Sequence, residues 1–336
     1  MISMKKTTAL VLSALLALSG CAKNPDDALT PVTLNEVAHS IFYAPQYAAI
    51  ELGYFKDQGI DLNLVNGAGA DKVMTALVSG DADIGFMGSE ASIYTYANGA
   101  SDYAVNFAQL TQRAGNFLVG RQPDPAFQWS KLKGTKVLGG RAGGMPQMVF
   151  EYILKKNGID PTKDLTIDQS ISFGLTAAAF TSNDFDYTVE FEPFATALEQ
   201  EGNGYVVASL GKDSGYVPYT AYSAKKSYLE KHPEIIQRFT NAIQKGLDYV
   251  NTHSATEIAE TIKPQFQETD TEKIKIIVER YKEQDTWKGN TVFEKESFEL
   301  LENILEEAGE LDTRVPYEDL VKTEFAKAAS ATTPPS

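Results

Sequence analysis

The stretch DKVMTALVSGDADIGFMGSE, residues 71–90, indicates the fold most directly. Residues 71–79 have apolar side chains at helical spacing, and a Gly-Asp pair that follows them is a turn signal. Residues 84–87 form a short apolar run typical of a buried strand, and the Gly-Ser-Glu run after them opens another helix. Helix, turn, strand and helix in this order predict an open, largely parallel α/β sheet.

The residues upstream continue the same alternation. Residues 32–37 alternate as a strand, residues 43–52 have helical spacing, and residues 61–65 read as the next strand. A glycine-containing loop at 66–69 then leads into the helix of the first stretch. These segments predict one lobe built from βα units.

The order recurs about a hundred residues later. Residues 136–139 predict a strand, and a glycine-rich loop leads from it into a helix over 146–157. Helical residues 174–180 then precede a strand over 187–191, which ends in a Glu-Pro pair and another helix. This repetition predicts a second lobe on the plan of the first, although any α/β protein reuses such units.

The remaining chain predicts one more strand, over 216–223, which returns to the first lobe, and a series of amphipathic helices. These helices are expected over residues 234–252, 254–262, 271–283 and 295–309. We therefore expect a two-lobed α/β fold in which the C-terminal helices pack on lobe 1. The expected boundaries are 32–117 with 217–327 for lobe 1 and 118–216 for lobe 2.

The N-terminus reads as an export signal. Lys5 and Lys6 precede an apolar run at 9–18, and the run ends in Leu-Ser-Gly-Cys with Cys21 as the only cysteine of the chain. We expect residues 1–20 to be a lipoprotein signal peptide, Cys21 to carry the lipid, and residues 21–31 to be a tether. The alternative is an ordinary signal peptide in which the cysteine is incidental. Residues 328–336 read as a flexible tail.

The charge of the chain argues against nucleic acid as a partner. The formal net charge is −15, and removal of the two lysines of the signal takes it to −17. Such a surface repels phosphate backbones and anionic lipid, so contact with a membrane is expected through the N-terminal lipid only. The apolar run at 9–18 is too short to cross a bilayer as a permanent helix, and the sequence has no other long apolar stretch.

The sequence lacks the usual residue patterns of catalysis. Its three histidines, His39, His232 and His253, are scattered, so no metal is expected. No nucleophile elbow and no phosphate loop occur, and the glycine-rich loop at 141–144 lacks the full dinucleotide fingerprint. Glu190 and Glu192 would point to the same face of a strand at close range. We expect no catalytic residue, no cofactor and no enzymatic activity.

Ligands of open α/β sheets bind beyond the carboxyl ends of the strands, where loops converge. The two lobes then face each other across a cleft that closes on a small molecule. The candidate ligand-binding residues are His39, Phe42, Tyr43, Gly69, Ser89, Glu90, Arg141, Gly143, Gly144, Met145, Tyr187, Glu190 and Glu192.

A family resemblance rests on several motifs in order. They are HSIFYAPQY at 39–47, GYF at 53–55, GIDL at 59–62, SGDADIG at 79–85, LKGTKV at 132–137 and Glu192-Pro193. Together they resemble the thiamine-pyrimidine, alkanesulfonate, taurine and nitrate group of ABC-importer binding proteins. The resemblance covers essentially the whole mature chain. It implies the two-lobed periplasmic-binding-protein (type II) fold with two hinge crossings, and a permease and its ATPase as partners. From the export signal we expect an extracytoplasmic location, and we expect a monomer.

The ligand is inferred from residue types. Aromatic rings at Phe42, Tyr43, Phe86, Tyr187 and Phe191 would sandwich a flat heterocycle. Glu190 or Glu192 would accept hydrogen bonds from an amine, as an aminopyrimidine of the thiamine pathway requires. The alternatives are that the strand aromatics belong to the core, that Glu192 caps a helix or pairs with a cation, and that His39 is a satisfied loop histidine.

Arg141 supports a second candidate ligand, a small organic anion. The backbone amides of Gly143 and Gly144 beside it would cradle an oxyanion, unless Arg141 bridges to Glu190 or Glu192 instead. Relatives that make the thiamine pyrimidine offer an enzyme alternative, but the sacrificed histidine and the iron site which that resemblance implies are not identifiable here. A sensor or adhesin on the same fold is the third class.

Overall fold

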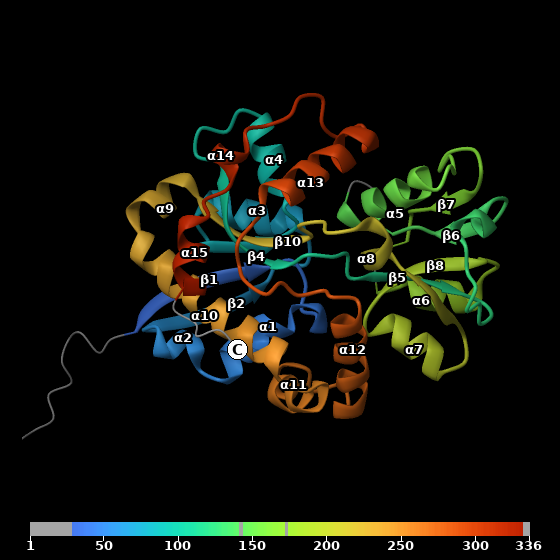
Figure 1. Ribbon diagram of the computed structural model, residues 1–336, viewed down its shortest axis with the longest axis horizontal. Coiled ribbons are helices and arrows are strands. Elements are labelled where there is room, and N and C mark those ends of the chain that lie inside the picture. The colour runs from blue at the N-terminus through green and yellow to red at the C-terminus, as the bar shows by residue number, and fades with distance from the viewer. Residues whose placement is uncertain (1–28, 141–143, 172–173, 332–336) are drawn as a thin grey trace, which may run out of the picture.

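The computed structural model describes residues 29–140, 144–171 and 174–331. The chain forms two five-stranded sheets that lie beside each other along the long axis of the molecule (Figure 1). We call the parts around the first and second sheets lobe 1 and lobe 2. The predicted signal peptide, Cys21, Arg141 and Gly143 lie outside the described residues.

The sheet of lobe 1 has the strand order β2-β1-β3-β10-β4. Its strands are β1 (Thr30–Glu36), β2 (Ile60–Asn66), β3 (Ile84–Met87), β4 (Ala104–Thr111) and β10 (Thr220–Lys225). β1 pairs in parallel with β2 and β3, whereas β10 pairs antiparallel with β3 and β4. Leu34 stands opposite Ile84, and both side chains are fully buried. The predicted tether therefore ends by Thr30, where β1 begins.

The sheet of lobe 2 has the order β7-β6-β8-β5-β9. Its strands are β5 (Asn116–Gly120), β6 (Lys136–Leu138), β7 (Thr166–Asp168), β8 (Tyr187–Phe191) and β9 (Tyr205–Ser209). β6 runs parallel to β7 and β8, and β5 runs antiparallel to β8 and β9. The two-lobed α/β prediction is confirmed. Each sheet is mixed because β5 and β10 enter their sheets from the opposite lobe.

The chain passes between the lobes twice. The first crossing is residues 112–115 and the second is residues 210–219. The first lies before the predicted boundary at 117, because Asn116 and Phe117 already pair with Phe191 and Glu190 of β8. The second begins before the predicted boundary at 216 and holds the short helix α8 (Leu210–Ser214).

Helices cover both sheets. Those of lobe 1 are α1 (Ala44–Glu51), α2 (Tyr54–Asp57), α3 (Ala70–Ser79), α4 (Glu90–Ala97), α9 (Lys226–Lys231), α10 (Pro233–Thr252), α11 (Ala255–Ile262), α12 (Thr271–Glu283), α13 (Lys295–Ala308), α14 (Tyr317–Leu320) and α15 (Glu324–Ala331). Those of lobe 2 are α5 (Met145–Lys156), α6 (Thr176–Ser182) and α7 (Phe194–Gln200). Three 3₁₀ turns are η2 (Ile41–Tyr43), η3 (Trp129–Leu132) and η4 (Lys263–Gln265). In the described ranges no helix has the length and apolar character that crossing a membrane requires.

The C-terminal helices pack mainly on lobe 1, as predicted. α10 lies so close to α1 that a Cβ on Gly246 would stand 2.1 Å from the carbonyl oxygen of Pro45, so the position requires glycine. α12 and α13 also reach lobe 2, where Lys155 of α5 donates to the carbonyl oxygen of Glu307. These helices therefore hold the two lobes together as well as covering a sheet.

The predicted flexible tail begins too early. Residues 328–331 belong to α15, where Ala329 is buried against the protein and α15 packs beside α10. The helix forms because its apolar face, with Phe325 and Ala326, is covered by lobe 1. Residues 332–336 lie outside the described residues.

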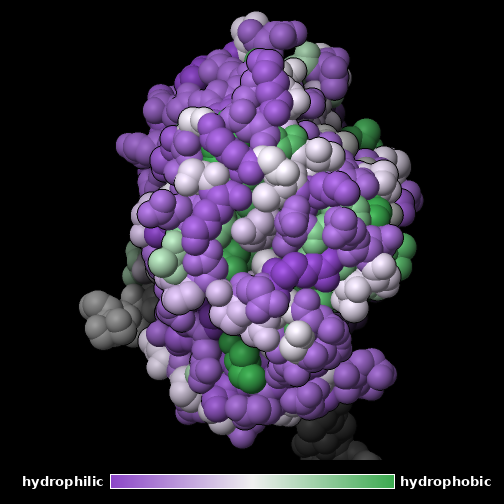
Figure 2. Space-filling model, turned by 90° about the vertical axis from the view of Figure 1, so that its right-hand side faces the viewer, coloured by the Kyte–Doolittle hydropathy of each residue, from purple (hydrophilic) through white to green (hydrophobic). Residues whose placement is uncertain are grey.

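The outer face of lobe 2 is mostly hydrophilic. Figure 2 shows this face, on which apolar side chains form small separate spots between polar ones. Leu175, 61% exposed at the start of α6, is the most exposed of the large apolar side chains described. Single exposed apolar residues of this kind are usual on a protein surface and define no binding patch.

Candidate ligand-binding site

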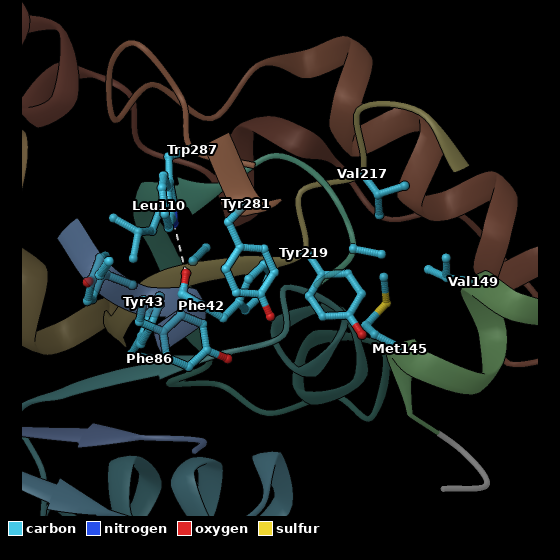
Figure 3. Packing of buried hydrophobic residues seen from close by; sticks show 14 of the residues in the cluster. Phe42, Tyr43, Phe86, Leu110, Met145, Val149, Val217, Tyr219, Tyr281 and Trp287 are labelled. Carbon is cyan, nitrogen blue, oxygen red and sulfur yellow. Dashed lines mark hydrogen bonds between the residues drawn. The ribbon is translucent and has the colours of Figure 1, made fainter. Parts of the chain in front are cut away.

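A cluster of aromatic rings lies where the two lobes meet (Figure 3). Phe42 comes from η2, Tyr219 from the second crossing, Tyr281 from α12 and Phe191 from the end of β8. The ring of Phe42 lies 5.2 Å from that of Tyr281 and 5.8 Å from that of Tyr219. The ring of Phe191 lies 6.4 Å from those of Phe42 and Tyr219. We call these four rings the interlobe aromatic cluster.

Short local contacts fix Phe42 in this cluster. The Ser40 hydroxyl accepts a hydrogen bond from the backbone N–H of Phe42 at 3.3 Å, and the Phe42 carbonyl accepts one from the Trp287 indole at 2.8 Å. The first crossing passes directly beside the ring, because a Cβ on Gly115 would lie 2.6 Å from it. The Gly115 carbonyl also accepts from the Tyr281 hydroxyl at 3.0 Å. Position 115 therefore requires glycine.

Tyr43 lies next to the cluster and rests on the core of lobe 1. Its ring stands edge-on to Phe86 at 4.5 Å, and Phe86 stacks on Tyr222 at 4.2 Å. Phe86 is fully buried beneath Tyr43. Phe86 was expected either to contact a ligand or to belong to the core, and this packing supports the core position.

Glu90 is a buried carboxyl beside these rings. It begins α4, is 5% exposed, and folds back over Gly88, where an added Cβ would stand 2.1 Å from Oε2. Its Oε2 has no hydrogen-bond partner among the described residues. Burial raises the pKa of Glu90 to about 7. Burial also raises the pKa of the Tyr43 and Tyr219 hydroxyls, and the charge of Glu90 adds to both shifts.

Two further buried polar side chains were not identified from the sequence. Asn116 is fully buried at the start of β5, and neither polar atom of its amide has a partner in the described part of the chain. Tyr219 is 5% exposed, and its hydroxyl likewise has no hydrogen-bond partner within residues 29–140, 144–171 and 174–331. Both residues flank the crossings, and a crossing has no sequence motif of its own.

Glu190 and Glu192 have different environments. Glu190 is buried and accepts hydrogen bonds from the hydroxyls of Thr188 at 2.6 Å and Thr176 at 2.9 Å. Burial raises its pKa to about 7, although these two hydrogen bonds act in the opposite direction.

Glu192 matches the alternative interpretation, in which it caps a helix and pairs with a cation. Its carboxylate accepts from the backbone N–H of Thr196 at 2.9 Å, in the first turn of α7, and from the hydroxyl of Thr196 at 3.0 Å. It also pairs with Arg280 of α12 at 2.6 Å. Arg280 pairs with Glu199 of α7 as well, so this ion pair joins α12 to lobe 2.

His39 is held by hydrogen bonds at both ring nitrogens. Nδ1 lies 2.8 Å from Glu36, and Nε2 lies 2.9 Å from the carbonyl oxygen of Gln265. The bond to Glu36 is the main cause that raises the pKa of His39, against desolvation. Glu36 is fully buried and also accepts from Gln46 and Tyr47 at 2.7 and 2.8 Å. This network ties η2 and α1 to β1.

The other predicted residues occupy the expected loops. Gly69 precedes α3, and Gly144 precedes α5. The Ser89 hydroxyl donates to the carbonyl oxygen of Pro218 at 2.6 Å and so attaches the start of α4 to the second crossing. Met145 is 2% exposed and lies beside Tyr219 in Figure 3.

Tyr187 does not join the cluster. It begins β8, and Phe191, which is in the cluster, ends it, so roughly 13 Å of extended strand separate their backbones. The Tyr187 ring instead packs 6.0 Å from Phe127 and against Gly120, within lobe 2. Its role as a ligand contact stays a prediction, and the structure places its ring at the opposite end of β8 from the cluster.

The described groups at this site are aromatic rings and polar side chains. Among the described residues, no group of three or more His, Cys, Asp or Glu side chains is arranged to hold a metal ion. Arg113 on the first crossing donates to the Gly211 carbonyl and lies over the Tyr216 ring at 4.2 Å, and Arg280 is engaged by Glu192. The site thus combines aromatic surface, a carboxyl, an amide and a phenol. Two α/β lobes that meet at such a site define a type II periplasmic-binding-protein fold.

Comparison with known proteins identifies the family. Residues 41–256 match the family described as NMT1/THI5 like, and the chain belongs to this family. It is 45% identical over 317 residues to the Bacillus subtilis protein named "Putative binding protein YtlA", with 94% of each chain covered. The chain is therefore a substrate-binding protein of the NMT1/THI5 type.

More distant similarities are to a biosynthetic enzyme and to a solved binding protein. The chain is 26% identical over 226 residues to the Saccharomyces cerevisiae 4-amino-5-hydroxymethyl-2-methylpyrimidine phosphate synthase THI11, covering 62% of this chain and 63% of the yeast protein. The solved alkanesulfonate-binding protein SsuA from Xanthomonas axonopodis pv. citri, bound to MOPS, superposes with a TM-score of 0.69 at 14% identity. That superposition covers 87% of this chain and 98% of SsuA, and it shows the shared fold.

Proposed function

We propose that this protein captures a small, flat, amine-bearing heterocycle between its lobes and delivers it to an ABC importer. A thiamine-precursor aminopyrimidine is the ligand that fits best. The observation that carries the proposal is Glu90, a buried carboxyl whose Oε2 has no partner in the described ranges, next to the interlobe aromatic cluster. Stacked rings bind a flat heterocycle, and a carboxyl accepts hydrogen bonds from its amine.

The same groups disfavour the anionic alternative. Above the raised pKa of Glu90, about 7, a sulfonate or nitrate at the cluster would be repelled by the ionised carboxylate in a site of low dielectric constant. Arg280 does not offset this charge, because Glu192 and Glu199 pair with it. Arg141, on which the anionic alternative rests, lies outside the described residues.

The proposed role is binding without catalysis. YtlA, which shares 45% identity with the chain, has a name that refers to binding, whereas the yeast synthases share about a quarter of the aligned residues. A permease and its ATPase are the expected partners, and Cys21 is the expected lipid-anchor site outside the cytoplasm. Mass spectrometry of the membrane-extracted protein tests the anchor. A diacylglyceryl group on Cys21 supports it, and a mature N-terminus without lipid contradicts it.

Ligand screening tests the proposal directly. Thermal unfolding of the purified protein is measured with a panel of aminopyrimidines, among them 4-amino-5-hydroxymethyl-2-methylpyrimidine, and with taurine and other alkanesulfonates. A ligand at a hundred times its Kd stabilises the folded state by about 2.7 kcal/mol, which is easily seen as a shift in Tm. We expect stabilisation by the aminopyrimidines. Stabilisation by the sulfonates alone would sink the proposal and support the anionic ligand.

A further inference from the structure

Three buried side chains near the junction of the lobes each have at least one polar atom without a protein partner in the described residues. They are Glu90 from lobe 1, Asn116 from lobe 2 and Tyr219 from the second crossing. We propose that these residues, which we call the interlobe trio, are polar ligand contacts, and that they select a neutral or cationic ligand with an N–H donor and adjacent acceptor atoms. The inference rests on the proposed function and names the residues that would perform it.

A hydrogen bond between the residues that precede them holds the backbones of Glu90 and Tyr219 close together. The Glu90 carboxylate acts electrostatically on the hydroxyls of both Tyr43 and Tyr219. The Ser89 hydroxyl binds the carbonyl oxygen of Pro218, so the residues directly before Glu90 and Tyr219 are joined at 2.6 Å. The start of α4 and the second crossing therefore present these two side chains from adjacent backbone positions.

Strand pairing places Asn116 on the same side. Asn116 of β5 is directly opposite Phe191 of β8 in an antiparallel pair, and side chains of such a pair project from the same face of the sheet. The Phe191 ring lies 6.4 Å from those of Tyr219 and Phe42. Gly115, which precedes Asn116, lies against the Phe42 ring. Asn116 thus reaches the cluster from lobe 2.

Leaving these groups without partners is unfavourable unless a ligand supplies them. Buried polar groups in folded proteins are nearly always hydrogen-bonded, and each exception calls for an explanation. Gln109 and Arg113 also have one buried atom without a partner among the described residues, but another atom of each side chain donates to a backbone carbonyl. Asn116 makes no such bond within the part of the chain described, and its whole amide is available.

The chemical nature of the trio restricts the ligand. Glu90 accepts an N–H, the Tyr219 hydroxyl donates to a ring nitrogen or oxygen, and the Asn116 amide both donates and accepts. An aminopyrimidine has an exocyclic amine beside a ring nitrogen and matches this pattern. A fully deprotonated anion has acceptors alone and would leave Glu90 without a donor. Because the three residues come from both lobes, a ligand that contacts all of them also joins the lobes.

The experiment combines binding with stability of the ligand-free protein. Glu90→Gln, Asn116→Leu and Tyr219→Phe are compared with wild type by titration calorimetry with 4-amino-5-hydroxymethyl-2-methylpyrimidine and by thermal unfolding without ligand. We expect each variant to weaken binding by about tenfold or more, because a hydrogen bond in a buried site is lost. We expect the Tm of the ligand-free protein to be unchanged or raised, because Asn116→Leu and Tyr219→Phe remove an unsatisfied polar group and Glu90→Gln removes a buried ionisable one.

Tyr47→Phe is the matched control. The Tyr47 hydroxyl is also buried, but it donates to Glu36 at 2.8 Å, so its loss should lower the Tm and leave the Kd unchanged. Trio variants that lower the Tm as Tyr47→Phe does and retain wild-type affinity would overturn the inference.

The stability measurement also separates this inference from the proposed function. If wild-type protein binds none of the aminopyrimidines, the proposed ligand class fails. The trio is then judged by its ligand-free Tm values alone. Values at or above that of wild type support a binding role, and values below it overturn that role.

Discussion

Two regions of this molecule bury carboxyl groups where lobe 1 meets lobe 2, and they differ in how the carboxyl is satisfied. At the Arg280 junction, which comprises Arg280, Glu192, Glu199 and Thr196, each acid has a cation or a hydrogen-bond donor. At the interlobe trio, Glu90 Oε2 has no donor within the described ranges. A carboxyl that the protein itself satisfies stabilises the fold, whereas one that it leaves open is available for a ligand.

Geometry explains why the two regions differ. Glu192 is placed at the start of α7, so the backbone of the helix supplies one donor and its second turn brings Glu199 to the same arginine. Glu90 is also at the start of a helix, but its carboxyl turns away over Gly88 toward the aromatic rings. Glu90, the first residue of α4, and Glu192, two residues before α7, therefore have different roles although both lie near the start of a helix.

The largest expected effect concerns the Arg280 junction. Arg280→Met removes the cation from Glu192, whose side chain is fully buried, and leaves an uncompensated charge. We expect the free energy of unfolding to fall by about 3–5 kcal/mol, measured by urea denaturation. The double variant Arg280→Met with Glu192→Gln is the control and should regain part of the loss. A single variant within about 1 kcal/mol of wild type would contradict a structural role.

The second prediction concerns pH and the raised pKa of the open carboxyl. Burial raises the pKa of Glu90 from 4.5 to about 7, so the folded ligand-free protein keeps a proton that the unfolded chain releases above pH 4.5. Stability is therefore highest below pH 4.5 for this group and falls as pH rises through 7, by about 3 kcal/mol in total.

Urea denaturation of the ligand-free protein between pH 5 and pH 8 measures this dependence. Glu190 shifts in the same direction, with a pKa of about 7, and contributes a loss of the same sign. Glu90→Gln should reduce the slope of stability against pH, while Glu190→Gln removes the other part. An unchanged slope in Glu90→Gln would show that its carboxyl is already ionised in the folded protein.

The third prediction compares the two acids that the sequence singled out as ligand contacts. Glu190→Gln should weaken aminopyrimidine binding by about 1–3 kcal/mol, because each carboxylate oxygen can accept more than the single threonine bond it has. Glu192→Gln should leave affinity unchanged, because its oxygens are engaged by Thr196 and Arg280. Calorimetric titration measures both. Wild-type affinity in Glu190→Gln would exclude Glu190 from the site.

The smallest expected change in stability is that of His39→Ala. This variant tests whether His39 is a loop histidine whose hydrogen bonds are satisfied within the protein. Its pKa is raised mainly by the bond to Glu36, so its stabilising contribution is present below pH 6.5 and is lost as pH rises through the folded-state pKa. His39→Ala should lower stability by about 1 kcal/mol at pH 5.5 and by less at pH 8. Affinity for the aminopyrimidine should not change. A tenfold loss of affinity would restore His39 as a ligand contact.

Several elements could be predicted to the residue from local pattern alone. The strands β3 and β8 and the helix α12 begin and end where the sequence predicts. For α12, Asp270 accepts a hydrogen bond from the backbone N–H of Lys273, which is a cap the sequence itself encodes. Turn signals and helical spacing act over a few residues, so one sequence reveals them.

Other elements have no local signal of that kind. Every residue of β4 is buried, including polar Asn106 and Gln109, so β4 shows no alternation of exposed and buried positions. β5 is equally buried along its length. Strands covered on both faces lack the period of two that identifies a strand in sequence, and both were missed for this reason.

The sequence by itself determined the α/β units, their arrangement in two lobes and the loops that face the junction, because these depend on spacing along the chain. Only the tertiary structure decided which acid is open and which is paired. Glu192 meets Arg280 from 88 residues away, whereas Ser89, the residue before Glu90, binds Pro218, the residue before Tyr219, across 129 positions of the chain. Whether a buried polar group is satisfied depends on partners distant in sequence, and packing alone brings them together or leaves the group open for a ligand.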